Sequence, residues 1–69
     1  MARVLSVLMG VHTYAIEMAT ADQIPADHHA AIAEKVLNAF LAGMRDGKTT
    51  QQLSTVTGTA YFQAVKGLV

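Results

Sequence analysis

The sequence predicts an all-α protein, a small bundle of two long antiparallel helices followed by two short C-terminal helices, and a dimer is its expected assembly. Apolar residues recur at helical spacing through most of the 69-residue chain. Hydrophobic residues make up 52% of the chain and charged residues 14%, against about 25% charged in an ordinary soluble domain. Strict apolar and polar alternation, the pattern of a half-buried strand, is not sustained.

The length of the chain limits how much apolar surface it can hide. Residues 1–69 form one domain, and a domain of this size buries only about 60% of the surface that its unfolded chain exposes. The remaining apolar surface needs another partner, and a two-fold homodimer is the commonest solution. We therefore expect a homodimer.

Composition excludes several classes of protein. The chain has no cysteine and a formal net charge of zero, which excludes disulfides and sulfur-ligated zinc and disfavours non-specific attraction to nucleic acid or anionic lipid. The apolar run behind Arg3 superficially suits a signal peptide, but it continues the helical pattern of residues 14–18. His12, Thr13 and Glu17 interrupt it before the ~20 apolar residues that a membrane span needs. We expect a cytoplasmic protein without a membrane partner.

The first helix is predicted from about Ala2 to about Thr20, and its apolar residues cover roughly 220° of the circumference. A strand is the competing interpretation because six of its residues are β-branched. One apolar face is expected to enter the core of the chain, and it consists of Val4, Val7, Leu8, Val11, Ala15 and Met18. The second face remains for a partner, either a second copy or a different protein, and this predicted protein interface consists of Leu5, Met9, His12 and Ile16.

A second helix is predicted from about Pro25 to Asp46. Proline suits the first turn of a helix because its missing N–H is not needed there. Gly47 is expected to end the helix in the left-handed conformation. The apolar residues fall on one side, so this helix should cover a single face: Ile32, Ala33, Val36, Leu37, Phe40, Leu41 and Met44.

The last third predicts two short helices. Residues 49–52, Thr-Thr-Gln-Gln, form a capping-box pattern at the start of a helix that runs to about Thr57. Gly58 marks a turn, and Thr59 can cap a fourth helix over residues 60–68. The inner face of that helix is expected to hold Tyr61, Phe62, Val65 and Leu68.

The segment from Gly47 to Leu68, GKTTQQLSTVTGTAYFQAVKGL, resembles the helix-turn-helix of bacterial and phage DNA-binding proteins. A capped helix, a Thr-Gly turn and a local basic excess carry the resemblance, whereas Thr59, Ala64 and Gly67 depart from its apolar positions. The resemblance implies a dimeric transcriptional regulator. The residues that it would place on DNA are Lys48, Thr59, Tyr61, Gln63 and Lys66.

Residues that could carry chemistry are scattered. His12, His28 and His29 lack the spacing of three or four residues that brings metal ligands to one helix face. Ser6 and Ser54 have no accompanying base and orienting acid in the sequence. We therefore expect no metal, no cofactor and no enzymatic activity, with His28 solvated and His29 half-buried.

The preferred function is that of a small non-enzymatic homodimer that binds another protein as a regulator, adaptor or inhibitor. The apolar composition favours it, since the cores of protein interfaces are likewise depleted in charge. DNA-binding regulation is the alternative.

Overall fold

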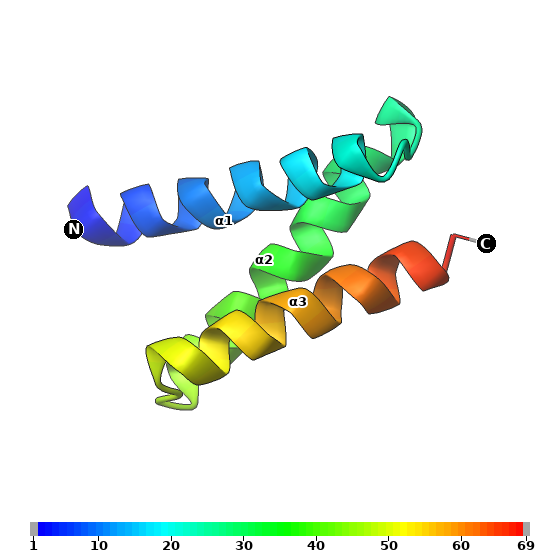
Figure 1. Cartoon of the computed structure of the whole chain (residues 1–69). Helices are drawn as coiled ribbons and strands as arrows, with labels where there is room; N and C mark the ends of the chain where they lie inside the picture. The colour runs from blue at the N-terminus through cyan, green and yellow to red at the C-terminus, as the bar shows by residue number, and fades with distance from the viewer. Residues whose placement is uncertain (1, 69) are drawn as a thin grey trace.

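The computed structural model describes the backbone of residues 2–68 and the side chains of residues 6–68. This part of the chain contains α1 (Ala2–Ala21), the 3₁₀ turn η1 (Ala26–His28), α2 (His29–Arg45) and α3 (Thr50–Lys66), and no strand (Figure 1). The all-α prediction is confirmed, and the first segment is a helix rather than a strand.

Helix α2 is the centre of the arrangement. It packs against both α1 and α3, while α1 and α3 run in the same general direction and α2 runs back between them (Figure 1). The molecule measures 32 × 22 × 15 Å, so its thinnest dimension is less than two helix diameters of about 10–12 Å. A molecule this thin can enclose only a small core.

The core is built largely from small side chains. Ala15 and Ala19 of α1 are fully buried, and the largest fully buried side chains are Ile32 and Val36 of α2. Small residues let helices approach closely, but they remove less apolar area from water than leucine or phenylalanine. Among the described residues, the main buried cluster consists of Ala15, Ala19, Ile32, Ala33, Val36, Tyr61 and Ala64.

Helix α1 ends in a Schellman motif without the usual glycine. The Ile24 N–H donates to the Ala19 carbonyl and the Gln23 N–H donates to the Thr20 carbonyl, both at 3.0 Å. Gln23 takes the left-handed conformation, with φ 60°. Partly buried Ile24 packs against the core, so the apolar contact that accompanies this motif is present.

Helix α2 ends and α3 begins as the sequence predicts. Gly47 has φ 76°, and the Lys48 N–H donates to the Gly43 carbonyl at 3.1 Å. The Thr49 hydroxyl then accepts from the Gln52 N–H at 3.2 Å, and the Gln52 side chain accepts from the Thr49 N–H at 2.9 Å. The capping box is therefore confirmed.

The prediction of two short C-terminal helices with a turn at Gly58 is wrong. Helix α3 continues from Thr50 to Lys66 through this glycine. Its inner residues recur at helical spacing on both sides of Gly58, and the hydroxyl of buried Thr57 is satisfied by donating to the Leu53 carbonyl at 2.8 Å. Ending the helix would break this stripe, which outweighs the ~1 kcal/mol helix cost of one glycine.

Continuity also corrects the inner face predicted for the C-terminal segment. The register that begins at Thr50 buries Tyr61 and Ala64 and turns Phe62 outward, where its side chain is 69% exposed. Leu68 is also exposed, and Val65 is half-buried. Residues 50–66 therefore form one helix, without a turn at Gly58.

The two glycines test this continuity as a matched pair. A Cβ at Gly58 would meet no heavy atom within 4 Å, whereas Gly47 holds a positive φ. We expect Gly58→Ala to raise the free energy of unfolding by about 0.5–1 kcal/mol, and Gly47→Ala to lower it by about 1 kcal/mol. Chemical denaturation measures both, and destabilisation by Gly58→Ala would contradict a continuous α3.

Candidate protein-binding groove

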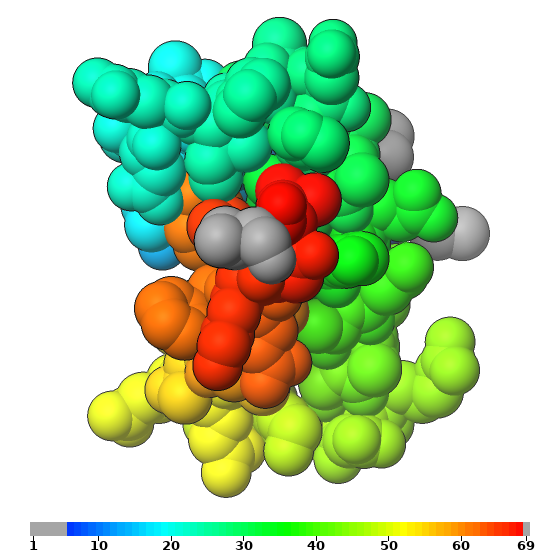
Figure 2. Space-filling view, turned by 90° about the vertical axis from the view of Figure 1, so that its right-hand side faces the viewer, coloured from blue at the N-terminus to red at the C-terminus, as the bar shows by residue number. Residues whose placement is uncertain are grey.

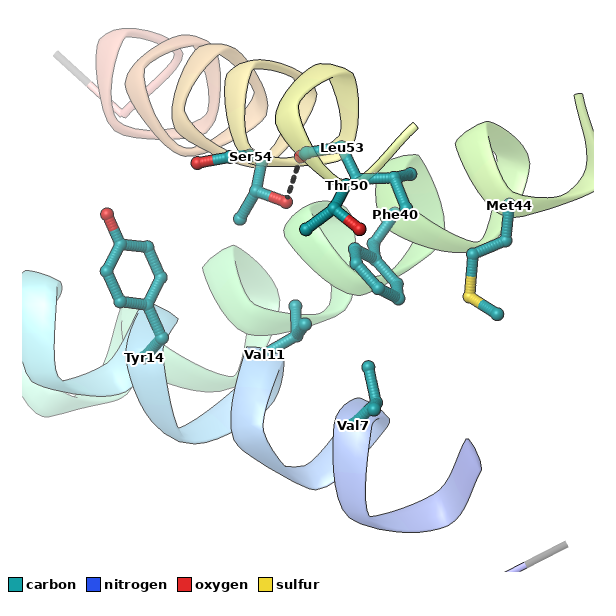
Figure 3. A pocket seen from close by; sticks show the side chains of 9 residues that line it. Val7, Val11, Tyr14, Phe40, Met44, Thr50, Leu53 and Ser54 are labelled. Carbon is teal, nitrogen blue, oxygen red and sulfur yellow. Dashed lines mark hydrogen bonds between the residues drawn. The ribbon is translucent and has the colours of Figure 1, made fainter. Parts of the chain in front are cut away.

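An apolar groove lies between the N-terminal halves of α1 and α3, with the C-terminal half of α2 as its floor. We call it the α1/α3 groove, and its volume is about 530 Å³. Side chains from α1 point toward the gap that separates this helix from α3 (Figure 3). The residues that line it are Val7, Val11, Tyr14, Phe40, Met44, Thr50, Leu53, Ser54 and Thr57.

The groove is open and carries no charge on its lining. Its polar groups are the hydroxyls of one tyrosine, two threonines and one serine. Val7 and Tyr14 on its α1 wall are 47% and 45% exposed, and Met44 on its floor is also exposed. Small-molecule sites enclose most of their ligand, whereas an open, uncharged apolar surface is typical of the centre of a protein interface.

The two walls of the groove have matching lengths. Val7 to Tyr14 on α1 and Thr50 to Thr57 on α3 each span two helical turns, or about 10 Å at 1.5 Å per residue. The groove can therefore accommodate roughly two turns of another helix.

The opposite end of the helix pair is closed. Tyr61 of α3 donates its hydroxyl to the Asp22 carboxylate, just beyond α1, at 2.5 Å. The segment after α1 and the last turns of α3 lie side by side there (Figure 2). Fully buried Ala15 and Ala19 belong to the same half of α1. α3 is thus tied to the segment that follows α1 at this end, while the groove lies at the other end.

A second close approach fixes the position of α3 on α2. A Cβ added at buried Gly43 would lie 2.7 Å from the Leu53 Cδ2 atom, so Leu53 occupies the space that a larger residue of α2 would fill. This contact positions the α3 wall of the groove over its floor.

The contact between Tyr61 and Asp22 changes the pKa of the tyrosine. Tyr61 is 6% exposed, and burial, followed by its hydrogen bond and charge interaction with Asp22, raises the pKa of its phenol to about 12. Tyr14 adds a smaller contribution in the same direction. The neutral phenol is therefore the form that holds α3 against the end of α1.

The structure places the residues of the predicted protein interface in different environments. Met9 is 61% exposed and His12 is exposed, but Ile16 is half-buried and packs against the core. The side chain of Leu5 lies outside the described residues. Met9 and His12 lie on the flank of α1 away from the groove.

The residues predicted to contact DNA also differ in their exposure to solvent. Thr59, Gln63 and Lys66 are exposed on one outer face of α3, and Lys48 is exposed before it. Tyr61 is buried and bound to Asp22, so its hydroxyl is not available to a nucleic acid. DNA binding itself stays a prediction.

The histidines occupy the environments that the sequence predicts for the second helix. His28 is exposed and His29 is half-buried, with its Nε2 atom 2.7 Å from the Ile24 carbonyl oxygen. Within residues 6–68, no group of three or more histidine, aspartate or glutamate side chains is arranged to hold a metal ion. None of the described helices is long and apolar enough to cross a membrane.

Sequence reasoning missed the groove because it assigned Val7, Val11 and Met44 to the core. The sequence did contain one signal of a separate face on α1. Val7, Gly10 and Tyr14 follow one another at spacings of three and four residues, which places them along one side of α1.

Comparison of the chain with protein-family models, curated protein sequences and solved structures found no match.

The contact between Tyr61 and Asp22 predicts the alkaline behaviour of the protein. In the unfolded chain tyrosine ionises near pH 10, while Tyr61 in the folded chain has a pKa of about 12. Between about pH 10 and about pH 12, unfolding therefore releases the proton of the Tyr61 phenol. The free energy of unfolding should fall as the pH rises from about 10 to about 12. Tyr61→Phe should make this fall shallower, as measured by denaturation at each pH.

Tyrosinate absorbance provides the control. We expect Asp22→Asn to move the ionisation of Tyr61 back toward pH 10 and Tyr14→Phe to move it much less. Ionisation of Tyr61 near pH 10 in the folded wild type would refute the buried contact.

Proposed function

We propose that the chain is a small homodimeric helical protein that acts, without catalysis, by binding another protein. Two surfaces of α1 are available for these roles, the α1/α3 groove on one flank and the Met9 side on the other. The lining of the groove is apolar or hydroxyl-bearing, which suits association better than acid-base chemistry.

The accessible surface is the observation that carries this proposal. A compact monomer of 7.3 kDa is expected to expose about 4,200 Å², whereas this chain exposes 4967 Å². The excess of about 800 Å² equals the area that one partner contributes to a protein interface of standard size. Covering one such surface would give the chain the exposure of an ordinary compact protein.

The Met9 side of α1 is the proposed surface for a different protein. Met9 is 61% exposed, and the flexible, polarizable side chain of methionine adapts to varied partner surfaces. Exposed His12 and Thr13 lie beside it, so this flank has an apolar centre and a polar rim. Interfaces between proteins that also exist apart have the same composition.

Sedimentation equilibrium tests the assembly. We expect the wild-type chain to sediment with twice its sequence mass, and the dimer to persist at high salt because the proposed contact is apolar. A monomer at all accessible concentrations would contradict the proposal.

Affinity capture from an extract of the producing organism tests the second role. We expect one protein to be retained by the wild type and by Phe62→Glu, whose site is also exposed, but lost from Met9→Glu. An identical set of proteins on all three, or nucleic acid in place of protein, would contradict it. The second result would support the DNA-binding alternative.

A further inference from the structure

We propose that a second copy of the chain covers the α1/α3 groove by laying its own α1 antiparallel along the α1 wall, with the two-fold axis passing beside Gly10. This inference rests on the homodimer proposed above and names the surface that forms it. The two α1 helices would then close both grooves at once, because each helix is a wall of one groove and the cover of the other.

A stripe of residues at regular spacing runs along α1. Their successive spacings are four, three, four and three, the repeat that keeps side chains on the seam between two paired helices. The described members are exposed or line the groove, and Arg3 belongs to the stripe by its position in the helix. The stripe consists of Arg3, Val7, Gly10, Tyr14 and Glu17.

The stripe is complementary to itself only when the two helices are antiparallel. Turning one copy about an axis at Gly10 brings the two glycines together and places Val7 beside the partner's Tyr14, offset by one residue, or about 1.5 Å, along the helix axis. Arg3 then lies level with the partner's Glu17. A parallel pair would instead place arginine beside arginine and glutamate beside glutamate, which like charges disfavour.

Gly10 gives an independent reason for a helix at this position. It lies inside α1, where glycine weakens a helix, and a Cβ added to it would meet no heavy atom within 4 Å. The packing of the single chain therefore does not require a glycine. A second backbone crossing at this point does, because glycine permits the closest approach between helices.

The groove suits this occupant in chemistry and in size. From Val4 to Ile16 the α1 sequence contains no Asp, Glu, Lys or Arg, and the groove lining is also uncharged. The two turns of wall between Val7 and Tyr14 match the two turns of partner helix between its own copies of these residues. The same surface contacts itself, as a two-fold interface requires.

Two substitutions on the same helix separate the two flanks of α1. We expect Val7→Glu to weaken dimerisation by roughly 100-fold or more, because two uncompensated carboxylates would enter the apolar seam. Met9→Glu places the same charge on the other flank and should leave the dissociation constant within about threefold of wild type. Sedimentation equilibrium measures the dissociation constants, and circular dichroism checks that each variant remains helical.

Charge exchange tests the orientation without disturbing the apolar seam. Arg3→Glu and Glu17→Arg should each weaken the dimer by roughly tenfold, since both symmetry-related pairs become repulsive. The double variant should restore wild-type affinity, because it reverses both charges of each pair. Failure of the double variant to recover would overturn the antiparallel pairing.

Cross-linking locates the axis, and the absence of native cysteine makes the result unambiguous. Gly10→Cys should form a disulfide-linked dimer under mild oxidation, whereas Gly58→Cys, also at an exposed helical glycine, should not. Equal cross-linking of both variants, or none at Gly10, would overturn the proposed axis.

The experiments also separate this inference from the function on which it rests. A wild-type dimer that is broken by Met9→Glu but not by Val7→Glu would overturn the groove docking and leave the homodimer standing. A wild-type monomer would overturn both. A dimer broken by Val7→Glu alone supports both.

Discussion

The arrangement depends on α2, which must serve as the packing partner of two helices at once. Its apolar side holds Ile32, Val36 and Phe40, and α1 and α3 both pack on it. Each outer helix therefore buries mainly the side that faces α2. Helix α1 is apolar over more of its circumference than one neighbour can cover, and this mismatch leaves both an open groove and an exposed Met9.

The two ends of the pair formed by α1 and α3 are packed differently. At one end, the hydrogen bond from Tyr61 to Asp22 ties α3 to the segment that follows α1. Toward the other end, Tyr14 and Leu53 are larger and stand between the helices without closing the gap. The groove is therefore a space between α1 and α3 that their apolar and hydroxyl-bearing side chains do not fill.

Local sequence signals could predict much of this fold. The capping box at Thr49 and the left-handed conformation of Gly47 depend on residues close in sequence, so the sequence pattern is enough to predict them.

The continuity of α3 through Gly58 could not be predicted from local signals. A glycine beside threonine is typical of a turn, and only the burial of Thr57 and Tyr61 against the other helices keeps the segment helical. The groove escaped prediction for a related reason, because it forms between two helices that are not consecutive in the sequence.

The pairing of α1 with a second copy is most directly tested by isotope-filtered nuclear Overhauser spectroscopy on an equal mixture of labelled and unlabelled chains. Contacts in such a spectrum arise only between subunits. The antiparallel arrangement predicts intermolecular signals between the Val7 methyl groups and the Tyr14 ring. Intermolecular signals confined to the Met9 methyl group, with none from Val7 or Tyr14, would contradict it.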